Sequence, residues 1–118
     1  MLELCKLLGW LPDARYRESP VASVAELCEF HDAGYVESLS RCVASGEVDR
    51  GSRERYGFGT LENPIFETLF ERAATQVGGS LLAAELALEG RIVFHPAGGT
   101  HHGRPDRASG FCYFNDPV

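Results

Sequence analysis

The clearest hydrophobic pattern covers residues 64–88, where apolar side chains recur every three or four positions and form a broad stripe. Its members are Phe66, Leu69, Phe70, Ala73, Ala74, Val77, Leu81, Ala84 and Leu88. The spacing predicts a long helix that Asn63 caps, with proline at the first helical position, and that Gly90 terminates. Gly78 and Gly79 lie in its middle, where each glycine costs about 1 kcal/mol relative to alanine. We therefore expect a close packing contact or a bend at these two glycines.

Three shorter helical patterns precede this segment. Residues 2–9 carry leucines at helical spacing and predict a short amphipathic helix. The sequence SVAE, residues 23–26, has the pattern of a capping box and predicts a short helix through Phe30. Residues 34–44 place valine and leucine side chains on one face and predict a further helix, with Asp32 as a candidate cap.

The remaining segments predict loops and one strand. Residues 46–64 are rich in glycine and charge and predict a long loop. Residues 91–95, RIVFH, predict a short buried strand that leads into a glycine-rich loop. Helices followed by such a strand and loop indicate an α/β fold, in which sites lie beyond the carboxyl ends of strands. His95, His101 and His102 fall at that place, and the single strand needs neighbours to form a sheet.

The composition narrows the class of protein. The chain has 118 residues, the length of one domain, with 44% hydrophobic and 24% charged residues, as in ordinary globular proteins. Its net charge of −6 argues against a general nucleic-acid binder, and no apolar run is long enough to predict a membrane span. The first residues lack the features of a signal peptide. Because the four cysteines form no CxxC pair, we expect reduced thiols and a cytoplasmic protein.

The adjacent His101 and His102 are the strongest candidates for chemistry. Two neutral imidazoles in one loop can serve as a general base and its electrostatic partner beside an attacking water, and they can also bind a transition metal. The flanking glycines let the backbone approach a ligand closely, and the run SGFCYFN, residues 109–115, supplies an aromatic wall. A polar surface loop that contains histidines by chance is the alternative. We expect His31 to bond its neighbours or face solvent, and Cys112 to be a small buried hydrophobe.

The run AGGTHHGRPDRASGFCYFNDPV, residues 97–118, resembles the signature of the zinc-dependent histone deacetylases and their bacterial relatives, the acetoin-utilisation and acetylpolyamine amidohydrolase proteins. That signature is a GG-x-HH-A loop followed by A-S-G-F-C-Y-x-N-D. Residues 20–39, with their His-Asp and Tyr-Val, and residues 62–88, with their Pro-x-Phe and Gly-Gly-Ser, resemble two further family segments. The resemblance covers residues 18–118 and leaves 1–17 as a poorly matched segment. It implies an α/β fold that is the N-terminal portion of the arginase/deacetylase-type fold, helix-rich with few strands.

The resemblance implies roles for the matched positions. His101 and His102 match the family's catalytic pair, which activates a zinc-bound water for amide hydrolysis. His102 would be the general base and His101 its electrostatic companion. Gly110 and Phe111 match the wall of the narrow channel that takes the acyl-lysine side chain.

Three other positions align more loosely or depart from the family pattern. Phe58, in YGFGT, would bind substrate from the opposite wall of the channel. Glu62 stands where many relatives carry a rim aspartate that grips substrate backbone amides. Gly103 replaces a common alanine.

Residues 1–118 would form a partial, N-terminal histone deacetylase-like domain. In the family, the zinc ligands, the tyrosine that polarises the scissile carbonyl and the aspartates that orient the histidines lie downstream of the position of Val118. We therefore expect zinc in the intact family domain and none in this chain alone. We also expect the isolated chain to be inactive or nearly so, because without zinc the attacking water is not acidified.

Three hypotheses about function follow. The chain is the N-terminal part of an amidohydrolase that removes acyl groups from acyl-lysine or from acylated amines such as polyamines. Alternatively, it is a non-catalytic oligomeric remnant that acts as an interaction protein, or a small metal-binding module of His95, His101, His102 and Cys112. We expect a homo-oligomer, because the apolar helix would otherwise be exposed, and neither a nucleic-acid nor a membrane partner.

Overall fold

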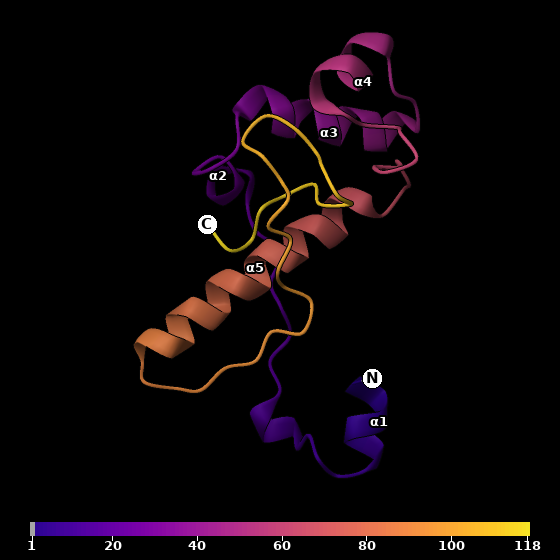
Figure 1. Ribbon diagram of the computed structural model, residues 1–118. Helices are drawn as coiled ribbons and strands as arrows, with labels where there is room; N and C mark the ends of the chain where they lie inside the picture. Colours follow the sequence, from indigo (N-terminus) through magenta and orange to yellow (C-terminus); the bar gives the residue numbers. More distant parts are fainter. Residues whose placement is uncertain (1) are drawn as a thin grey trace.

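The computed structural model describes residues 2–118, which form helices joined by long connecting segments (Figure 1). The elements are α1 (Leu2–Leu7), the 3-10 turn η1 (Asp13–Arg15), α2 (Val24–Leu27), α3 (Ala33–Ser45), α4 (Arg50–Tyr56) and α5 (Leu69–Leu88). Within this range no residues pair into a β-sheet, and the only bridges are two isolated ones, Arg104 with Arg107 and Ser109 with Cys112. The predicted helix-rich character is confirmed. None of the described helices is long and apolar enough to cross a membrane.

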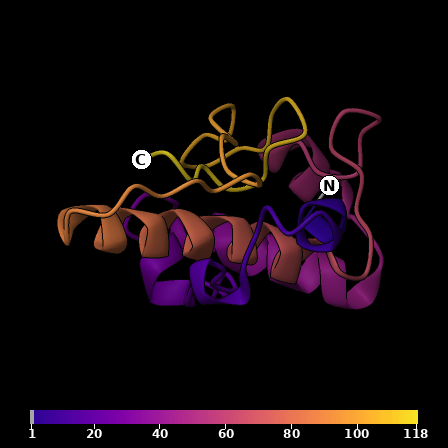
Figure 2. The same ribbon diagram turned by 90° about the horizontal axis from the view of Figure 1, so that it is seen from below.

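Helix α5 is the central element of the fold. The helices α2 and α3 lie on one side of it, and residues 91–118 lie on the other (Figure 2). Helix α3 packs directly against α5. The core combines side chains of these two helices with residues 108–114. The largest fully buried side chains are Tyr35, Phe58, Phe114, Leu27, Leu39, Val36 and Cys42.

The two glycines in the middle of α5 mark a close approach of the chain, as predicted. Both are buried. A Cβ atom on Gly78 would lie 2.0 Å from the carbonyl oxygen of Pro20, and one on Gly79 would lie 2.3 Å from Cε1 of His95. Glycine therefore allows two other segments to cross this helix in contact with its backbone.

Helix α5 begins later than the sequence predicts. Its first residue is Leu69, so Asn63 does not cap it and residues 64–68 are not helical. Asn63 is buried instead, and its side-chain amide donates to the carbonyl oxygens of Gly57 and Ala108, both at 3.4 Å. The predicted start was wrong because the side-chain oxygen, which a cap would use as the acceptor, instead accepts from the Phe111 N–H at 3.2 Å.

The shorter helices follow the predicted pattern, with differences at their ends. Helices α1 and α3 occupy the segments predicted from their apolar spacing. The capping box of α2 is confirmed: Glu26 N–H donates to the Ser23 hydroxyl at 3.2 Å, and Ser23 N–H donates to the Glu26 carboxylate at 2.6 Å. This helix ends at Leu27 rather than at Phe30, because the chain enters a turn there. Asp32 occupies the N-cap of α3, but its side chain makes no capping hydrogen bond.

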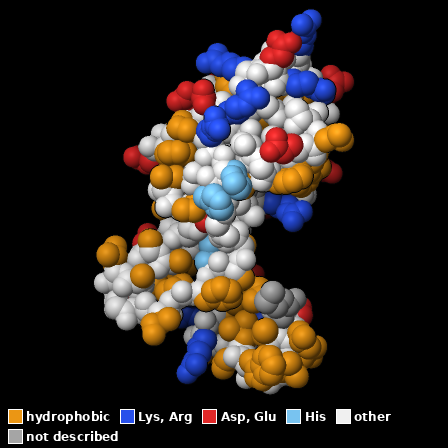
Figure 3. All heavy atoms as spheres, viewed as in Figure 1, with side chains coloured by type: hydrophobic (Ala, Val, Ile, Leu, Met, Phe, Trp, Pro, Cys, Tyr) orange, Lys and Arg blue, Asp and Glu red, His pale blue; other side chains and the backbone are white. Residues whose placement is uncertain are grey.

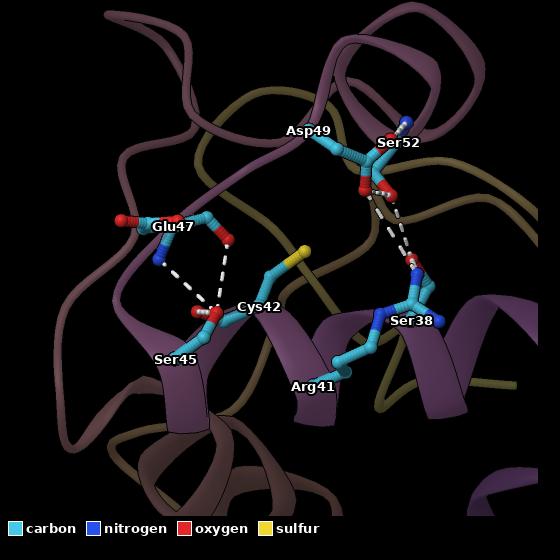
Figure 4. Close-up of polar contacts among 7 residues, drawn as sticks. All are labelled: Ser38, Arg41, Cys42, Ser45, Glu47, Asp49 and Ser52. Atoms are coloured by element: carbon cyan, nitrogen blue, oxygen red, sulfur yellow. Dashed lines mark hydrogen bonds and ion pairs between the residues drawn. The ribbon is translucent and has the colours of Figure 1, made fainter.

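Residues 46–64 are not the continuous loop that their glycines predict, because they contain α4. The Asp49 carboxylate caps this helix, accepting from the Ser52 N–H at 2.9 Å and from the Ser52 hydroxyl at 2.6 Å (Figure 4). The buried hydroxyls of Ser38 and Ser52 lie 3.1 Å apart, so α4 is also tied to α3. Aspartate is a preferred N-cap residue, and the glycine content of the segment concealed this signal.

Residues 91–95 have no regular secondary structure and do not form the predicted buried strand. They pair with no neighbour within the described residues, and Ile92 and Phe94 are 105% and 82% exposed. A strand needs partners for its backbone N–H and C=O groups, and the described part of the chain supplies none beside this segment. Further apolar side chains gather in the half of the molecule that carries α1 and the end of α5 (Figure 3).

Candidate functional site

The two adjacent histidines of the glycine-rich loop lie together at the surface. The ring centroids of His101 and His102 are 4.3 Å apart, and both residues are exposed. Histidine side chains are visible on the face shown in Figure 3, between the charged and the apolar halves. His101 Nδ1 lies 3.0 Å from the carbonyl oxygen of Gly99. Because a carbonyl can only accept, Nδ1 carries the proton and Nε2 is left as an acceptor.

The carboxylate of Asp116 holds the loop that carries these histidines. It accepts from Gly99 N–H at 3.0 Å, from Thr100 N–H at 2.5 Å and from the Ser80 hydroxyl of α5 at 2.5 Å. Burial opposes ionisation, but the hydrogen bonds from Ser80, Thr100 and Gly99 outweigh it, so the pKa of Asp116 lies below its ordinary value. The carboxylate is therefore charged at neutral pH and ties the loop to α5.

Asn115 holds the same loop from its other side. Its side-chain amide donates to the carbonyl oxygens of His101 at 3.3 Å and Gly103 at 2.9 Å. Its backbone N–H donates to His31 Nε2 at 2.9 Å. Sequence reasoning gave Asn115 and Asp116 no role, and their place in the quoted signature run was the only signal that could have found them.

His31 supports this arrangement from the connection between α2 and α3. It is 3% exposed and bonds residues far away in the sequence, so the expectation that it faces solvent or bonds its neighbours was wrong. Its Nε2 accepts from Asn115, so Nδ1 carries the proton and donates to the Pro105 carbonyl oxygen at 3.3 Å. Burial lowers the pKa of His31, and the carbonyls of Pro105 and Arg104 and the charge of Asp32 oppose this effect. The framework therefore contains a neutral imidazole.

We expect the chain to lose stability as the pH falls from about 7.5 to about 5.5, because the pKa of His31 is lower in the folded than in the unfolded chain. The unfolded imidazole has a pKa of about 6.5 and binds more protons in this window. The contribution of the neutral His31 to the free energy of unfolding is thus fully present above the pKa of the unfolded chain. It is lost as the pH falls toward the lower pKa of His31 in the folded chain. Urea unfolding at both pH values measures the difference.

Two variants separate His31 from other groups that titrate. His31→Phe is expected to be less stable at both pH values and to show a flatter pH dependence. His101→Asn, the matched control, removes an exposed imidazole and keeps the dependence that His31 causes. An equal pH dependence in the parent chain and in His31→Phe would contradict the assignment.

A tight turn at residues 109–112 lies against the ring of His102. Hydrogen bonds of 2.9 and 3.2 Å join its first and last residues. Its central residues, Gly110 and Phe111, have φ values of 57° and 62°, as in a type I′ turn. A Cβ atom on Gly110 would lie 2.9 Å from His102 Cγ. Phenylalanine rarely adopts positive φ, and here this conformation places Phe111 at the tip of the turn, 69% exposed.

Glu62 and Asn63 fix the backbone of this turn. The Glu62 carboxylate accepts from Gly110 N–H at 2.8 Å, and the Asn63 side-chain oxygen accepts from Phe111 N–H at 3.2 Å. Two adjacent side chains thus hold two adjacent amides. The rim role expected for Glu62 stays a prediction, and its observed contact is with the turn.

Phe58 is not brought to the histidine pair. Its ring is 0% exposed and packs against Tyr35 and Tyr56 at centroid distances of 5.2 and 5.5 Å. A channel wall needs an exposed ring, so the expected position of Phe58 on the opposite wall is corrected: this side chain belongs to the core.

The described residues contain no group of three or more histidine, cysteine, aspartate or glutamate side chains that could hold a metal ion. The donors of the hypothetical metal module, His95, His101, His102 and Cys112, are therefore not gathered into a site. His95 lies against α5, with Nε2 at 3.1 Å from the Gln76 carbonyl oxygen, and Cys112 is buried as expected. By themselves, the side chains in this range do not fit the zinc site that the resemblance implies.

The same fold occurs in solved structures of deacetylase homologues. A crystal structure of an HDAC homologue from Aquifex aeolicus matches with a TM-score of 0.95 and 34% sequence identity, over 98% of this chain and 31% of that chain. A crystal structure of an HDAC homologue complexed with SAHA gives the same values. The chain thus has the N-terminal portion of the arginase/deacetylase type of fold, as the resemblance implies.

The family follows from the sequence comparison. Residues 1–118 match the profile described as "Histone deacetylase domain", and the chain belongs to this family. Histone deacetylase 8 of Xenopus tropicalis is 38% identical over 117 residues, which cover 98% of this chain and 31% of that protein. The acetoin utilization protein AcuC of Bacillus subtilis (strain 168) is 35% identical over 117 residues, covering 97% of this chain and 30% of that protein. The chain spans about a third of the length of these relatives.

Proposed function

We propose that this chain supplies the proton-transfer groups of a histone deacetylase-like amidohydrolase, a protein that removes acyl groups from acyl-lysine or acylated amines. The observation that carries the proposal is the exposed pair of His101 and His102, whose rings lie 4.3 Å apart on an anchored loop. His102 acts as the general base and His101 as its electrostatic companion. General bases of this kind contribute typically 10²–10⁴-fold to the rate.

The turn beside His102 supports a substrate-binding role for Gly110 and Phe111. An exposed aromatic side chain at positive φ is conformationally costly, and such outliers cluster at functional sites. We infer that these residues form a wall along the acyl-lysine side chain. Glu62, which holds the Gly110 amide, is proposed to reach substrate amides at the rim.

Zinc is a general feature of this family, and the residues described here do not form its site. We propose that other parts of the protein hold the metal, which supplies an acidified water when bound. The contribution of this chain is then to accept the proton and to line the channel. We therefore predict no turnover of an acetyl-lysine peptide by the 118-residue chain, even with added zinc.

A chimera tests the proposal in a complete domain. In the Bacillus subtilis AcuC protein, residues 1–118 of this chain replace the matched segment. We expect the chimera to hydrolyse an acetyl-lysine peptide and His102→Ala to lower kcat/KM by about 10²–10⁴-fold. The control His95→Gln removes an imidazole that lies against α5 and should leave activity close to that of the chimera.

Two results would contradict the proposal. One is a folded, zinc-loaded chimera that does not hydrolyse the peptide, and the other is an active chimera that is insensitive to His102→Ala. Robust turnover by the isolated chain, abolished by His102→Ala, would instead contradict the prediction that this chain is inactive alone.

We also propose a cytoplasmic location, a homo-oligomer and a class of substrate. A cytoplasmic location is supported by the four cysteines, none of which forms a disulfide among the described residues. A homo-oligomer is supported by the exposed apolar side chains of α1 and of residues 91–94. Acyl-lysine and acylated polyamines fit the proposed site equally well, because both present an acylated primary amine on an aliphatic chain.

A further inference from the structure

The segment that follows the histidine pair packs against the end of α4. Residues 104–107 form a tight turn that begins two residues after His102, and hydrogen bonds of 2.9 and 3.4 Å join its ends. The Arg107 guanidinium donates to the carbonyl oxygens of Glu54 and Arg55, each at 3.2 Å. The turn and the last residues of α4 therefore form one continuous surface, which starts beside the histidine pair.

Arginine is concentrated in these two segments. Residues 50–57 and 104–107 contain five arginines and two acidic residues, although the whole chain has a net charge of −6. Arg50 of α4 is paired with Glu54 at 2.7 Å. Three of the other arginines lie on the shared surface, and we call them the arginine rim: Arg55, Arg104 and Arg107. All three are exposed, and none of them forms an ion pair within the described residues.

Two members of the arginine rim are held close to each other. Arg104 and Arg107 form an isolated antiparallel bridge, so they lie directly opposite each other across the turn. Like charges in that position are destabilising, and an anion bound between them would relieve the repulsion. Figure 3 shows Lys and Arg side chains above the histidines, over the end of the molecule that carries α4 in Figure 1.

Two carboxylates oppose the positive charge of the rim. Asp106 lies at the tip of the same turn and is exposed. The Glu62 carboxylate accepts from Gly110 N–H at 2.8 Å, so it is already engaged by the turn beside His102. The three arginines outnumber these two acidic residues, which leaves the surface beside the histidine pair positive.

We propose that the arginine rim binds acidic side chains that flank the acylated lysine of a peptide, so that the site prefers acidic acyl-lysine peptides to acylated polyamines. An arginine guanidinium binds a carboxylate through two parallel hydrogen bonds. A polyamine is polycationic and would meet like charge at the same place. The choice of substrate rests on the proposed function, whereas the binding of an acidic peptide is a property of this chain.

The geometry of a peptide determines which of its residues the rim can attract. An extended chain advances at most about 3.6 Å per residue, so side chains one to three positions from the acyl-lysine lie within about 11 Å of it. This is close to the Debye length of about 10 Å at 0.1 M salt, so the rim attracts such carboxylates before contact is made. The effect of the rim should therefore weaken as the salt concentration rises.

Titration of the 118-residue chain with two acetyl-lysine peptides tests the proposal. One peptide carries aspartate at the two positions on each side of the acetyl-lysine, and the other carries asparagine there. ¹H–¹⁵N spectra follow the backbone amides of residues 104–107 and the Nε–H groups of the rim. We expect the acidic peptide to bind about tenfold more tightly at low salt, the lower end of the effect of electrostatic attraction on association. At about 1 M salt, where the Debye length is about 3 Å, the two peptides should bind alike.

A double variant locates the effect. Arg55→Gln with Arg104→Gln removes two charges of the rim and leaves Arg107 to hold the turn against α4. We expect this variant to lose most of the preference for the acidic peptide. The matched control, Arg15→Gln with Arg17→Gln, removes two exposed charges at η1 and should keep the preference. Equal losses in the two double variants would show that net charge alone acts, and would overturn the proposal.

Equal affinity for the two peptides at low salt would also overturn the proposal. So would tighter binding of a single-stranded oligonucleotide of the same charge, because the rim would then belong to a nucleic-acid site. Folding is monitored by the exchange of the amides of Val36 and Leu39 in α3. If these are not protected in the isolated chain, the same titration is made with the chimera.

Kinetics of the chimera separate this proposal from the proposed function. We expect the ratio of kcat/KM for the acidic peptide to kcat/KM for N-acetylspermidine to fall about tenfold when Arg55 and Arg104 are replaced by glutamine. An inactive chimera that still prefers to bind the acidic peptide would contradict the proposed function and support the rim. An active chimera without this preference would overturn the proposal for the rim alone.

Discussion

Replacing Gly78 by alanine is expected to destabilise the chain by about 3 kcal/mol or more. The new Cβ would lie 2.0 Å from the carbonyl oxygen of Pro20, a backbone atom that cannot rotate away. The crossing segment is also held by the hydrogen bond from Ala22 N–H to the Ala74 carbonyl oxygen at 3.1 Å. The gain of about 1 kcal/mol in helix propensity does not offset this overlap. The free energy of unfolding in urea measures the effect.

The matched control is Gly34→Ala in α3. There the nearest atom to a new Cβ is the Tyr56 hydroxyl at 3.6 Å, an ordinary contact. We expect no loss of stability, and a gain of up to about 1 kcal/mol from helix propensity. Equal free energies of unfolding for the two variants would show that the crossing at Gly78 is not tight.

Truncating Phe114 to alanine is expected to cost about 3–5 kcal/mol of stability, the range for a buried aromatic residue. This ring is almost fully buried and contacts the rings of His31, Tyr35 and Phe70 at centroid distances of 5.2, 6.3 and 5.5 Å. It therefore docks residues 108–114 onto α3 and α5, and its loss opens a cavity between them. Chemical denaturation followed by circular dichroism gives the difference in free energy.

Phe111→Ala is the control for Phe114→Ala. The same truncation three residues earlier removes an exposed ring, and exposed substitutions usually change stability by about 0.5 kcal/mol or less. A loss at Phe111 as large as that at Phe114 would mean that the exposed ring is buried in solution, for example against a second copy of the chain.

The helices that bury one face could be predicted from the sequence. Helices α3 and α5 were located because periodic apolar residues report a buried face, and α2 because its capping box is a local interaction. Gly78 and Gly79 indicated a close packing contact, because glycine lowers the stability of a helix interior and its presence there suggests that another segment needs the space.

Predictions failed where contacts distant in the sequence replaced local ones. Asparagine is a common cap residue, but the side-chain oxygen of Asn63 accepts from the Phe111 N–H and its NH₂ group donates to Gly57 and Ala108. Residues 91–95 have the composition of a strand, but pairing depends on a neighbour that the described residues do not supply. Helix α4 was missed because its capping Asp49 lies in a glycine-rich segment.

For the candidate site, the resemblance identified the residues of the loop and turn but not those that hold them. His101, His102, Gly110 and Phe111 stand in a recognisable run. Asp116 bonds Ser80, 36 residues earlier, and no sequence pattern reports such a contact. Phe58 shows the opposite error, because alignment of a loop does not reveal whether a ring faces a channel or the core.

The long-range contacts of α3 and of His31, just before it, have a consequence for the order of folding during synthesis. Asn115 bonds His31 across 84 residues, and Tyr35 donates to the Tyr113 carbonyl across 78 residues. At 5–20 residues per second, the ribosome needs roughly 4–17 s to make the segment that separates such partners. The apolar face of α3 is therefore made well before the residues that cover it. A chaperone that binds exposed apolar helices would have its longest opportunity during this interval.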